Sequence, residues 1–174
     1  MEFSGTGPTG PMDSRAIQQL LPHRPPFVWV DRISECEPGK RARGIKLVSV
    51  NDPLVAGELT SAGRDGGGEA GGEAAGSFPR MLLVEAIAQV AAVALLPLVN
   101  EGEADRPTGG PGVLPLFAGM EDVVFGPPVR AGDVIDIEVE VLQARKSAAR
   151  VSGRCLVAGE VVARGTFLFA FRRQ

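Results

Sequence analysis

The stretch that decides the fold is residues 79–96, which read PRMLLVEAIAQVAAVALL. It opens on Pro79, contains no Gly and is built from good helix formers, so we expect one helix over 79–96. The stretch is apolar almost all round, which is typical of a helix that is buried on every side. Two polar residues inside it, Glu85 and Gln89, are four positions apart and therefore share one helix face.

Glu85 stands out on physical grounds alone. A carboxylate in the middle of a buried apolar helix is costly, and desolvation there raises its pKa. Such a group can take or give a proton near neutral pH. Two structural interpretations are equally open: Glu85 fixes packing by bonding a backbone group or Gln89, or the helix lies at a dimer seam.

The segments around this helix have the patterns of half-buried strands. Residues 134–141 alternate apolar and acidic side chains without a break, and 161–171 place three phenylalanines on one face. The expected strands are 27–33, 42–50, 114–125, 134–141, 149–157 and 161–171. Turns are expected at 37–40 and 158–160, and a short helix capped by Asp13 at 14–21. Five or six strands that follow one another as antiparallel neighbours predict a sheet curled around one buried helix.

Length and composition indicate one domain with loose segments. The chain has 174 residues, of which 44% are apolar, enough for one core. We expect a disordered tail at 1–12, a single domain over 13–174, and flexible loops at 60–77 and 100–112. The first loop contains seven Gly and no large apolar side chain, so it cannot bury enough surface to offset its ordering entropy.

Rare residue types and charge exclude several functions. The one histidine, His23, excludes a multi-histidine zinc site, and the net charge of −3 argues against bulk nucleic-acid binding. Cys36 and Cys155 form no paired motif, so we expect reduced thiols in a cytoplasmic protein. We also expect no signal peptide, and no membrane span, because the apolar run of 81–96 is shorter than about 20 residues.

The C-terminal part of the chain is basic. Residues 145–174 carry seven Lys and Arg residues against one Glu, whereas the rest of the chain is acidic. Such a segment can receive an acidic partner, and it can equally form an ordinary solvated sheet face.

Four motifs in order resemble the 3-hydroxyacyl-[acyl carrier protein] dehydratases of fatty-acid synthesis. They are LLPHRPPFVWVDR at 20–32, NDP at 51–53, LLVEAIAQ at 82–89, and FAGM with the following F, PV and GD at 117–133. The resemblance covers residues 13–171 outside the two loops. It implies an α+β hot-dog fold, in which an antiparallel sheet of five or six strands wraps around one long buried helix. It also implies a dimer whose sheets pair edge to edge, with the acyl chain in a tunnel at the seam.

The resemblance assigns roles to several residues. The family removes water across the α and β carbons of an acyl thioester, with a His and a Glu from opposite subunits as acid and base. Glu85 matches the family glutamate, and Gln89, which we expect to bind substrate, matches a glutamine one turn later. Phe117 and Gly119 fall in a motif that we expect to bind substrate.

Three positions depart from the family pattern. Glu58 stands where the catalytic histidine is expected, and a second alignment, which leaves fewer residues before the helix, places Ser77 there. Arg80 replaces the glycine at the helix start, whose N–H polarises the thioester carbonyl, and it remains a candidate substrate-binding residue. His23 matches a different family histidine, in the opening motif, which is not the catalytic one.

These departures lead to three functional hypotheses. In the first, the chain is a dehydratase-like protein that is inactive alone, and either binds acyl chains or completes a site with a histidine-bearing homologue. In the second, it is an active dehydratase (a lyase) that uses Glu85 with Glu58. In the third, it is a hot-dog thioesterase in which Glu85 activates water and Arg80 acts as an electrophile. All three imply acyl carrier protein or a coenzyme A thioester as partner, a homo- or heterodimer, and no metal or other cofactor.

Overall fold

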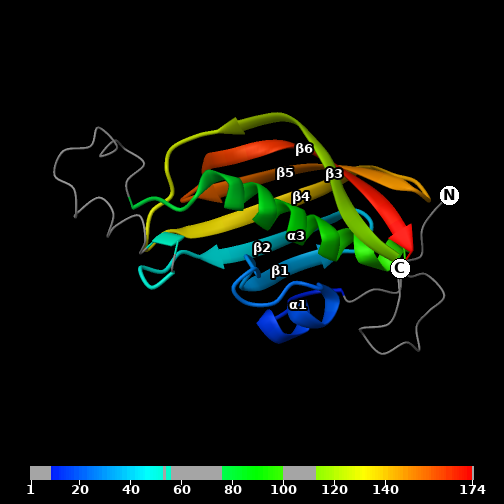
Figure 1. Ribbon diagram of the computed structural model, residues 1–174, viewed down its shortest axis with the longest axis horizontal. Coiled ribbons are helices and arrows are strands. Elements are labelled where there is room, and N and C mark those ends of the chain that lie inside the picture. Colours follow the sequence, from blue (N-terminus) through cyan, green and yellow to red (C-terminus); the bar gives the residue numbers. More distant parts are fainter. Residues whose placement is uncertain (1–8, 53, 56–75, 100–112, 174) are drawn as a thin grey trace.

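The architecture is one antiparallel sheet wrapped around one long helix (Figure 1). This computed structural model describes residues 9–52, 54–55, 76–99 and 113–173. The elements are α1 (Ser14–Leu20), β1 (Arg32–Glu37), β2 (Arg41–Leu47), α3 (Arg80–Val99), β3 (Val113–Phe125), β4 (Val134–Ala144), β5 (Ala148–Val157) and β6 (Glu160–Arg173). The six strands are ordered β1-β2-β4-β5-β6-β3, with every neighbouring pair antiparallel. The fold predicted from the sequence is therefore confirmed.

Helix α3 forms the centre of the core. Every residue from 83 to 96 is buried except Glu85, as expected for a helix that is apolar almost all round. The helix runs three residues beyond its predicted end and includes Pro97 in its last turn. Its window Arg80–Pro97 has the length and apolarity of a membrane span, but 67% of that window is buried inside the protein, as in the core helix of a globular domain.

Two glycines on the sheet allow α3 to approach closely. A Cβ atom on Gly153 of β5 would lie 2.2 Å from Cγ2 of Ile87, and one on Gly44 of β2 would lie 2.6 Å from Cγ2 of Val90. Both distances are far below van der Waals contact, so a side chain at either position would push the helix off the sheet. Gly153 faces the helix and has no side chain. This is one reason why the apolar alternation at 149–157 is weak in the sequence.

We expect Gly153→Ala to lower the free energy of unfolding by about 1–3 kcal/mol, because it overpacks the contact between β5 and α3. Gly119→Ala is the matched control, since its Cβ would meet only Leu168, at 3.7 Å. The control should change stability by less than about 0.5 kcal/mol. Urea denaturation measures both, and equal midpoints for the two variants would contradict the close approach.

The predicted strand at 27–33 is wrong, because β1 begins only at Arg32. The N–H of Asp31 already bonds to the carbonyl of Ile45 in β2, at 2.8 Å, whereas the backbone at Phe27 and Trp29 bonds to a side chain of α3. The N–H of Trp29 donates to Oε1 of Gln89, and Nε2 of Gln89 donates to the carbonyl of Phe27, both at 2.8 Å. The amide of Gln89 thus takes the place of a strand partner. Trp29 and Val30 pack in the core without strand pairing, whereas Phe27 is exposed.

The other predicted strands are confirmed with shifted ends. Strand β2 stops at Leu47, three residues early, and β4 continues three residues further, to Ala144. The turn at 158–160 is confirmed, with positive φ angles of 49° at Ala158 and 86° at Gly159. The short helix is also confirmed, because the Asp13 side chain accepts from the N–H of Ala16 at 2.8 Å and caps α1.

The predicted boundary of the N-terminal tail is wrong at Met12. This residue is buried and pairs with Ile33 through two backbone hydrogen bonds of 2.9 Å, so it belongs to the folded domain. Within the predicted loop 60–77, Ser77 forms a bridge with Arg130. Residues 1–8, residues 60–75 and the whole predicted loop 100–112 lie outside the described part of the chain.

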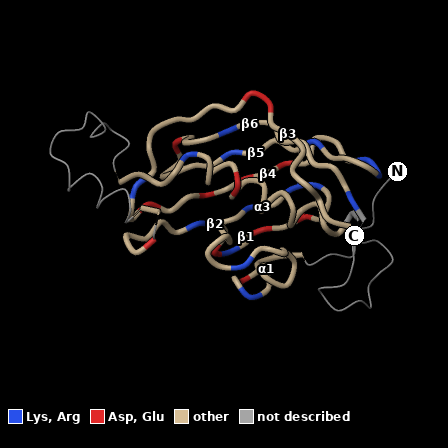
Figure 2. Tube along the Cα trace, viewed as in Figure 1, with Lys and Arg blue, Asp and Glu red and all other residues tan. Residues whose placement is uncertain are grey.

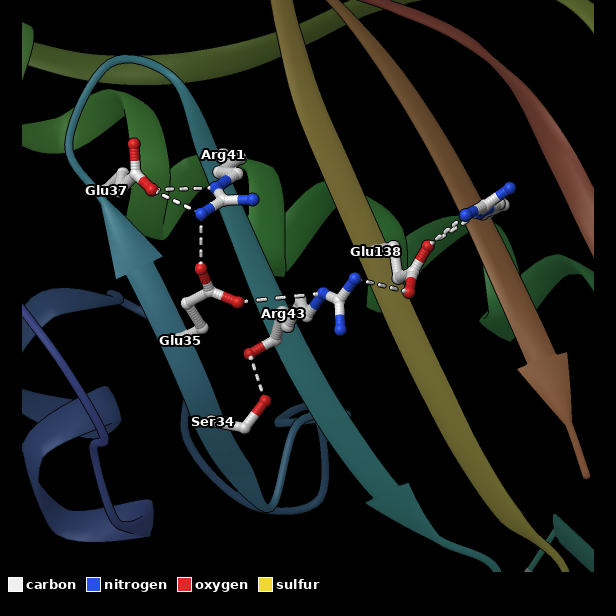
Figure 3. A network of polar contacts seen from close by, with 7 residues as sticks. Ser34, Glu35, Glu37, Arg41, Arg43 and Glu138 are labelled. Carbon is white, nitrogen blue, oxygen red and sulfur yellow. Dashed lines mark hydrogen bonds and ion pairs between the residues drawn. The ribbon is translucent and has the colours of Figure 1, made fainter. Parts of the chain in front are cut away.

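Strands β1, β2, β4 and β5 carry charged residues of both signs (Figure 2), and on the sheet face that points away from α3 these side chains are paired (Figure 3). This charge ladder consists of Glu35, Glu37, Arg41, Arg43, Glu138 and Arg154. Arg41 contacts Glu35 at 2.7 Å, and Arg43 contacts Glu138 at 3.2 Å. The arginine side chains are half exposed, so solvent screens these pairs and they add little to stability.

The ladder also neutralises part of the basic C-terminal segment. Arg154 donates to Glu138 at 2.6 Å, and Arg150 donates to Glu121 at 2.8 Å. Two of the basic residues that we considered for an acidic partner are therefore already paired within the chain. This favours the ordinary solvated face for that part of β5.

Candidate functional site

A pocket lies between α3, β3 and the segment after α1, with a cavity volume of about 220 Å³. Helix α3 contributes Glu85, Ala88, Gln89, Ala92 and Leu96. Residues 21–23, residues 114–117 and Phe169 complete the wall. The α3 residues recur at helical spacing, so they form one stripe along the pocket. The wall is apolar except at the end that holds Glu85, Gln89 and His23.

Glu85 lies in the wall of this pocket and not in the closed core. Its side chain is 39% exposed, so the burial that we predicted for it is wrong for the single chain. Its Oε1 atom accepts a hydrogen bond from Nε2 of Gln89 at 2.9 Å. The same oxygen lies 3.5 Å from Nε2 of His23. The packing interpretation is thus correct in one respect, because Gln89 is the partner that orients Glu85.

Gln89 is the buried centre of the polar group, with 1% of its surface exposed. Its oxygen accepts from the N–H of Trp29, and its nitrogen donates to the carbonyl of Phe27 and to Glu85. These bonds use both amide N–H groups and the oxygen, so the orientation of the amide is determined. Gln89 therefore joins the opening motif to the carboxylate on α3.

His23 is a site residue that sequence reasoning did not place near Glu85. The opening motif gave His23 no catalytic role and no position, and the structure places its ring beside Glu85. The loop is held by Arg24, whose Nη1 donates to the carbonyls of Leu21 and His23, each at 2.8 Å. Residues 23 and 85 are far apart in sequence, and no periodic pattern connects a loop to a helix across that distance.

Of the other predicted site residues that the structure describes, one lines the pocket and two do not. Phe117 lines the pocket, and its ring packs edge-on against Phe169 with centroids 5.9 Å apart. Arg80 is exposed at the first position of α3, and neither Arg80 nor Gly119 lines the pocket. Glu58 lies outside the described residues, so the position expected for the catalytic imidazole is not placed.

The cysteines are separate from this site. Both are free and buried. Burial raises the pKa of the Cys155 thiol to about 12, and burial together with Glu37 raises that of Cys36 to about 11. At neutral pH both are therefore protonated and weakly nucleophilic. In the described part of the chain, no three His, Cys, Asp or Glu side chains come together as a metal site.

A six-stranded antiparallel sheet around a central helix, with a pocket against the helix, defines a hot-dog domain. Two solved structures share this fold. The dehydratase heterocomplex ApeI:P from Xenorhabdus doucetiae matches with a TM-score of 0.66 and 16% identity, over 91% of each chain. A hypothetical thioesterase from Streptococcus pneumoniae TIGR4, solved with coenzyme A, matches with a TM-score of 0.55 and 12% identity, over 82% of this chain and 85% of that one.

The chain belongs to the 3-hydroxyacyl-[acyl-carrier-protein] dehydratase FabZ family. It is 40% identical over 156 residues to the FabZ of Caldicellulosiruptor bescii, which covers 90% of this chain and 96% of the relative. It is 36% identical over 159 residues to the FabZ of Bacillus subtilis, and this match covers 91% of this chain and 97% of the relative. No protein-family model matches the chain. The resemblance predicted from the four motifs is therefore confirmed.

Proposed function

We propose that this chain handles acyl thioesters in fatty-acid metabolism as the glutamate-bearing subunit of a dehydratase-type dimer in the cytoplasm. The observation that supports it is the placement of Glu85, held by Gln89 at the polar end of an apolar pocket. Its curated relatives are named as dehydratases of 3-hydroxyacyl groups on acyl carrier protein. The substrate we propose is accordingly an acyl thioester of acyl carrier protein or coenzyme A.

The chemistry requires two proton-transfer groups. A base takes the proton from the α carbon, and an acid protonates the hydroxyl on the β carbon, which leaves as water while the α–β double bond forms. Glu85 can be one of these groups, because Gln89 bonds its Oε1 and no hydrogen bond engages Oε2 among the described residues. The apolar wall of the pocket suits the acyl chain.

We propose that the second group comes from another protein. At the position of the family histidine this chain has Glu58, and at the helix start it has Arg80 in place of glycine. A homodimer would then hold Glu85 without the imidazole that the family takes from the opposite subunit. A heterodimer with a histidine-bearing homologue would hold one complete site and one incomplete site. The ApeI:P heterocomplex is a dehydratase assembly of the same fold, which supports this arrangement.

The edge strand β3 is the surface we propose for the partner subunit. It lies at the end of the sheet and exposes Leu116, Phe117, Met120 and Val124. An apolar edge strand with unpaired backbone groups is a template for pairing with another strand. Leu116 and Phe117 also line the pocket, so a subunit paired here would complete the pocket wall.

The test is complementation between two proteins that are each inactive. The homologue is taken with its own catalytic glutamate changed to glutamine, so that it retains only the histidine. We expect the mixed heterodimer to hydrate a 2-enoyl thioester, since its one complete site pairs that histidine with Glu85. A heterodimer that forms, as shown by mass, and yet has no turnover would overturn the proposal.

The pocket predicts a preference for acyl length. Ala92→Leu fills the middle of the α3 stripe, so a long acyl chain loses the burial of about two methylene groups at roughly 0.8 kcal/mol each. We expect affinity for a ten-carbon acyl-coenzyme A to fall by about tenfold, measured by calorimetry. A four-carbon acyl-coenzyme A, which does not reach Ala92, is the internal control. An equal loss for both ligands would contradict an acyl chain lying along α3.

A further inference from the structure

We infer that His23 is a positioning residue for Glu85, so that the glutamate half of the site is assembled within one chain. This inference deepens the proposed function, because it concerns the same carboxylate. The contacts that support it all lie within one chain and need no partner subunit. His23, Glu85 and Gln89 come from one chain and meet at one end of the pocket.

Two nitrogen atoms converge on one oxygen of Glu85. Nε2 of Gln89 donates to Oε1 at 2.9 Å, and Nε2 of His23 lies 3.5 Å from the same atom. The longer distance exceeds that of a formed N–H···O bond, which is about 2.7–3.2 Å. A shift of a few tenths of an ångström would form it, and such contacts in active sites often tighten when substrate binds. Gln89 thus holds Oε1, His23 lies ready to bond the same atom, and Oε2 is left for the substrate.

The other nitrogen of the ring, Nδ1, also indicates that the imidazole donates its N–H to Glu85. Nδ1 of His23 is buried and has no hydrogen-bond partner within the described structure. A ring that carries its proton on Nε2 avoids a buried N–H group without an acceptor. This tautomer directs the single N–H of the imidazole at Glu85.

The same geometry indicates that His23 positions Glu85 and does not itself exchange a proton with the substrate. One ring nitrogen of His23 is buried, and the other faces Glu85. Neither nitrogen is therefore left to exchange a proton with a substrate in the pocket. His23 acts through Glu85, and the imidazole that completes the reaction still comes from the partner subunit.

The surroundings of His23 are simple enough for a specific test. Glu85 is the other titratable residue that lines the pocket, and Arg24 is the charged neighbour in the loop, where it bonds the carbonyl of His23. His23 is also the one histidine of the chain, so its imidazole signals in NMR need no assignment.

The first measurement is nitrogen NMR of His23 in the full chain, with no partner required. We expect the neutral ring to carry its proton on Nε2, and Glu85→Gln to shift the Nε2 signal. Glu160→Gln, an exposed carboxylate on the β5–β6 hairpin, is the control and should leave it unchanged. A proton on Nδ1, or an Nε2 signal that ignores Glu85→Gln, would overturn the inference.

The second measurement is turnover by the complementing heterodimer. We expect His23→Ala to lower kcat by about 10–100-fold with little change in KM, as for other partners that orient a catalytic group. His23→Gln, which can place an N–H near the position of Nε2, should recover most of kcat. Full activity in His23→Ala would overturn the positioning role and leave the proposed function intact. An inactive heterodimer together with the expected NMR signature would overturn the proposed function alone.

Discussion

Glu85→Gln is expected to lower turnover by the heterodimer by about 10²–10⁴-fold, the usual contribution of a general acid or base. Glutamine has the size of glutamate and can still accept the hydrogen bond from Gln89. It lacks a group that takes or gives a proton, so the loss isolates the chemistry from the packing. The change is measured as the rate of hydration of a 2-enoyl thioester, followed by the loss of its conjugated absorbance.

The control for this variant is binding. Affinity for a saturated acyl-coenzyme A should stay within about twofold of the unmodified protein, since the apolar wall is unchanged and twofold is only about 0.4 kcal/mol. Retention of full turnover in the variant would show that Glu85 is a packing residue. The fatty-acyl site would then need a different proton donor.

Gln89→Leu is expected to lower the free energy of unfolding by about 2–5 kcal/mol. Leucine fits the buried volume, but it leaves the N–H of Trp29 and the carbonyl of Phe27 without their partner. A buried polar group that loses its hydrogen bond costs about 1–3 kcal/mol. The N–H of Trp29 is buried, the carbonyl of Phe27 is partly buried, and Glu85 also loses its donor. Denaturation in urea measures the loss.

Gln19→Leu is the matched control, because Gln19 is exposed on α1. It should change stability by less than about 0.5 kcal/mol. If Gln89→Leu were as stable as the control, the hydrogen bonds of Gln89 to Trp29 and Phe27 would contribute nothing to stability. The same variant should also lose activity in the heterodimer, because Glu85 loses the donor to its Oε1 atom.

The sequence predicted the parts of the fold that depend on local patterns. The apolar run at 79–96 predicted α3, and the alternation at 134–141 and 161–171 predicted β4 and β6. The strand predicted at 27–33 was wrong, because a run of apolar residues indicates which side chains are buried and not what the backbone bonds to. There the partner is Gln89, some 60 residues away in the sequence.

In the candidate site, too, the residues that share a local pattern could be predicted and the contacts between distant segments could not. Glu85 and Gln89 were found together because a spacing of four on a helix is a local signal. The burial of Glu85 was overestimated, since periodicity does not show that a pocket opens beside one turn of the helix. The contact of His23 with Glu85 depends on how the loop after α1 folds onto α3, and that is a tertiary property. The role of Glu58 stays a prediction.

The central claim is that this chain supplies Glu85 but no catalytic imidazole. The most direct test is turnover of a 3-hydroxyacyl thioester by the purified chain alone, beside its Glu85→Gln variant, with folding checked by circular dichroism. We expect no turnover above the variant's background. Turnover by the chain alone that disappears in Glu85→Gln would contradict it, because the chain would then possess both the acid and the base.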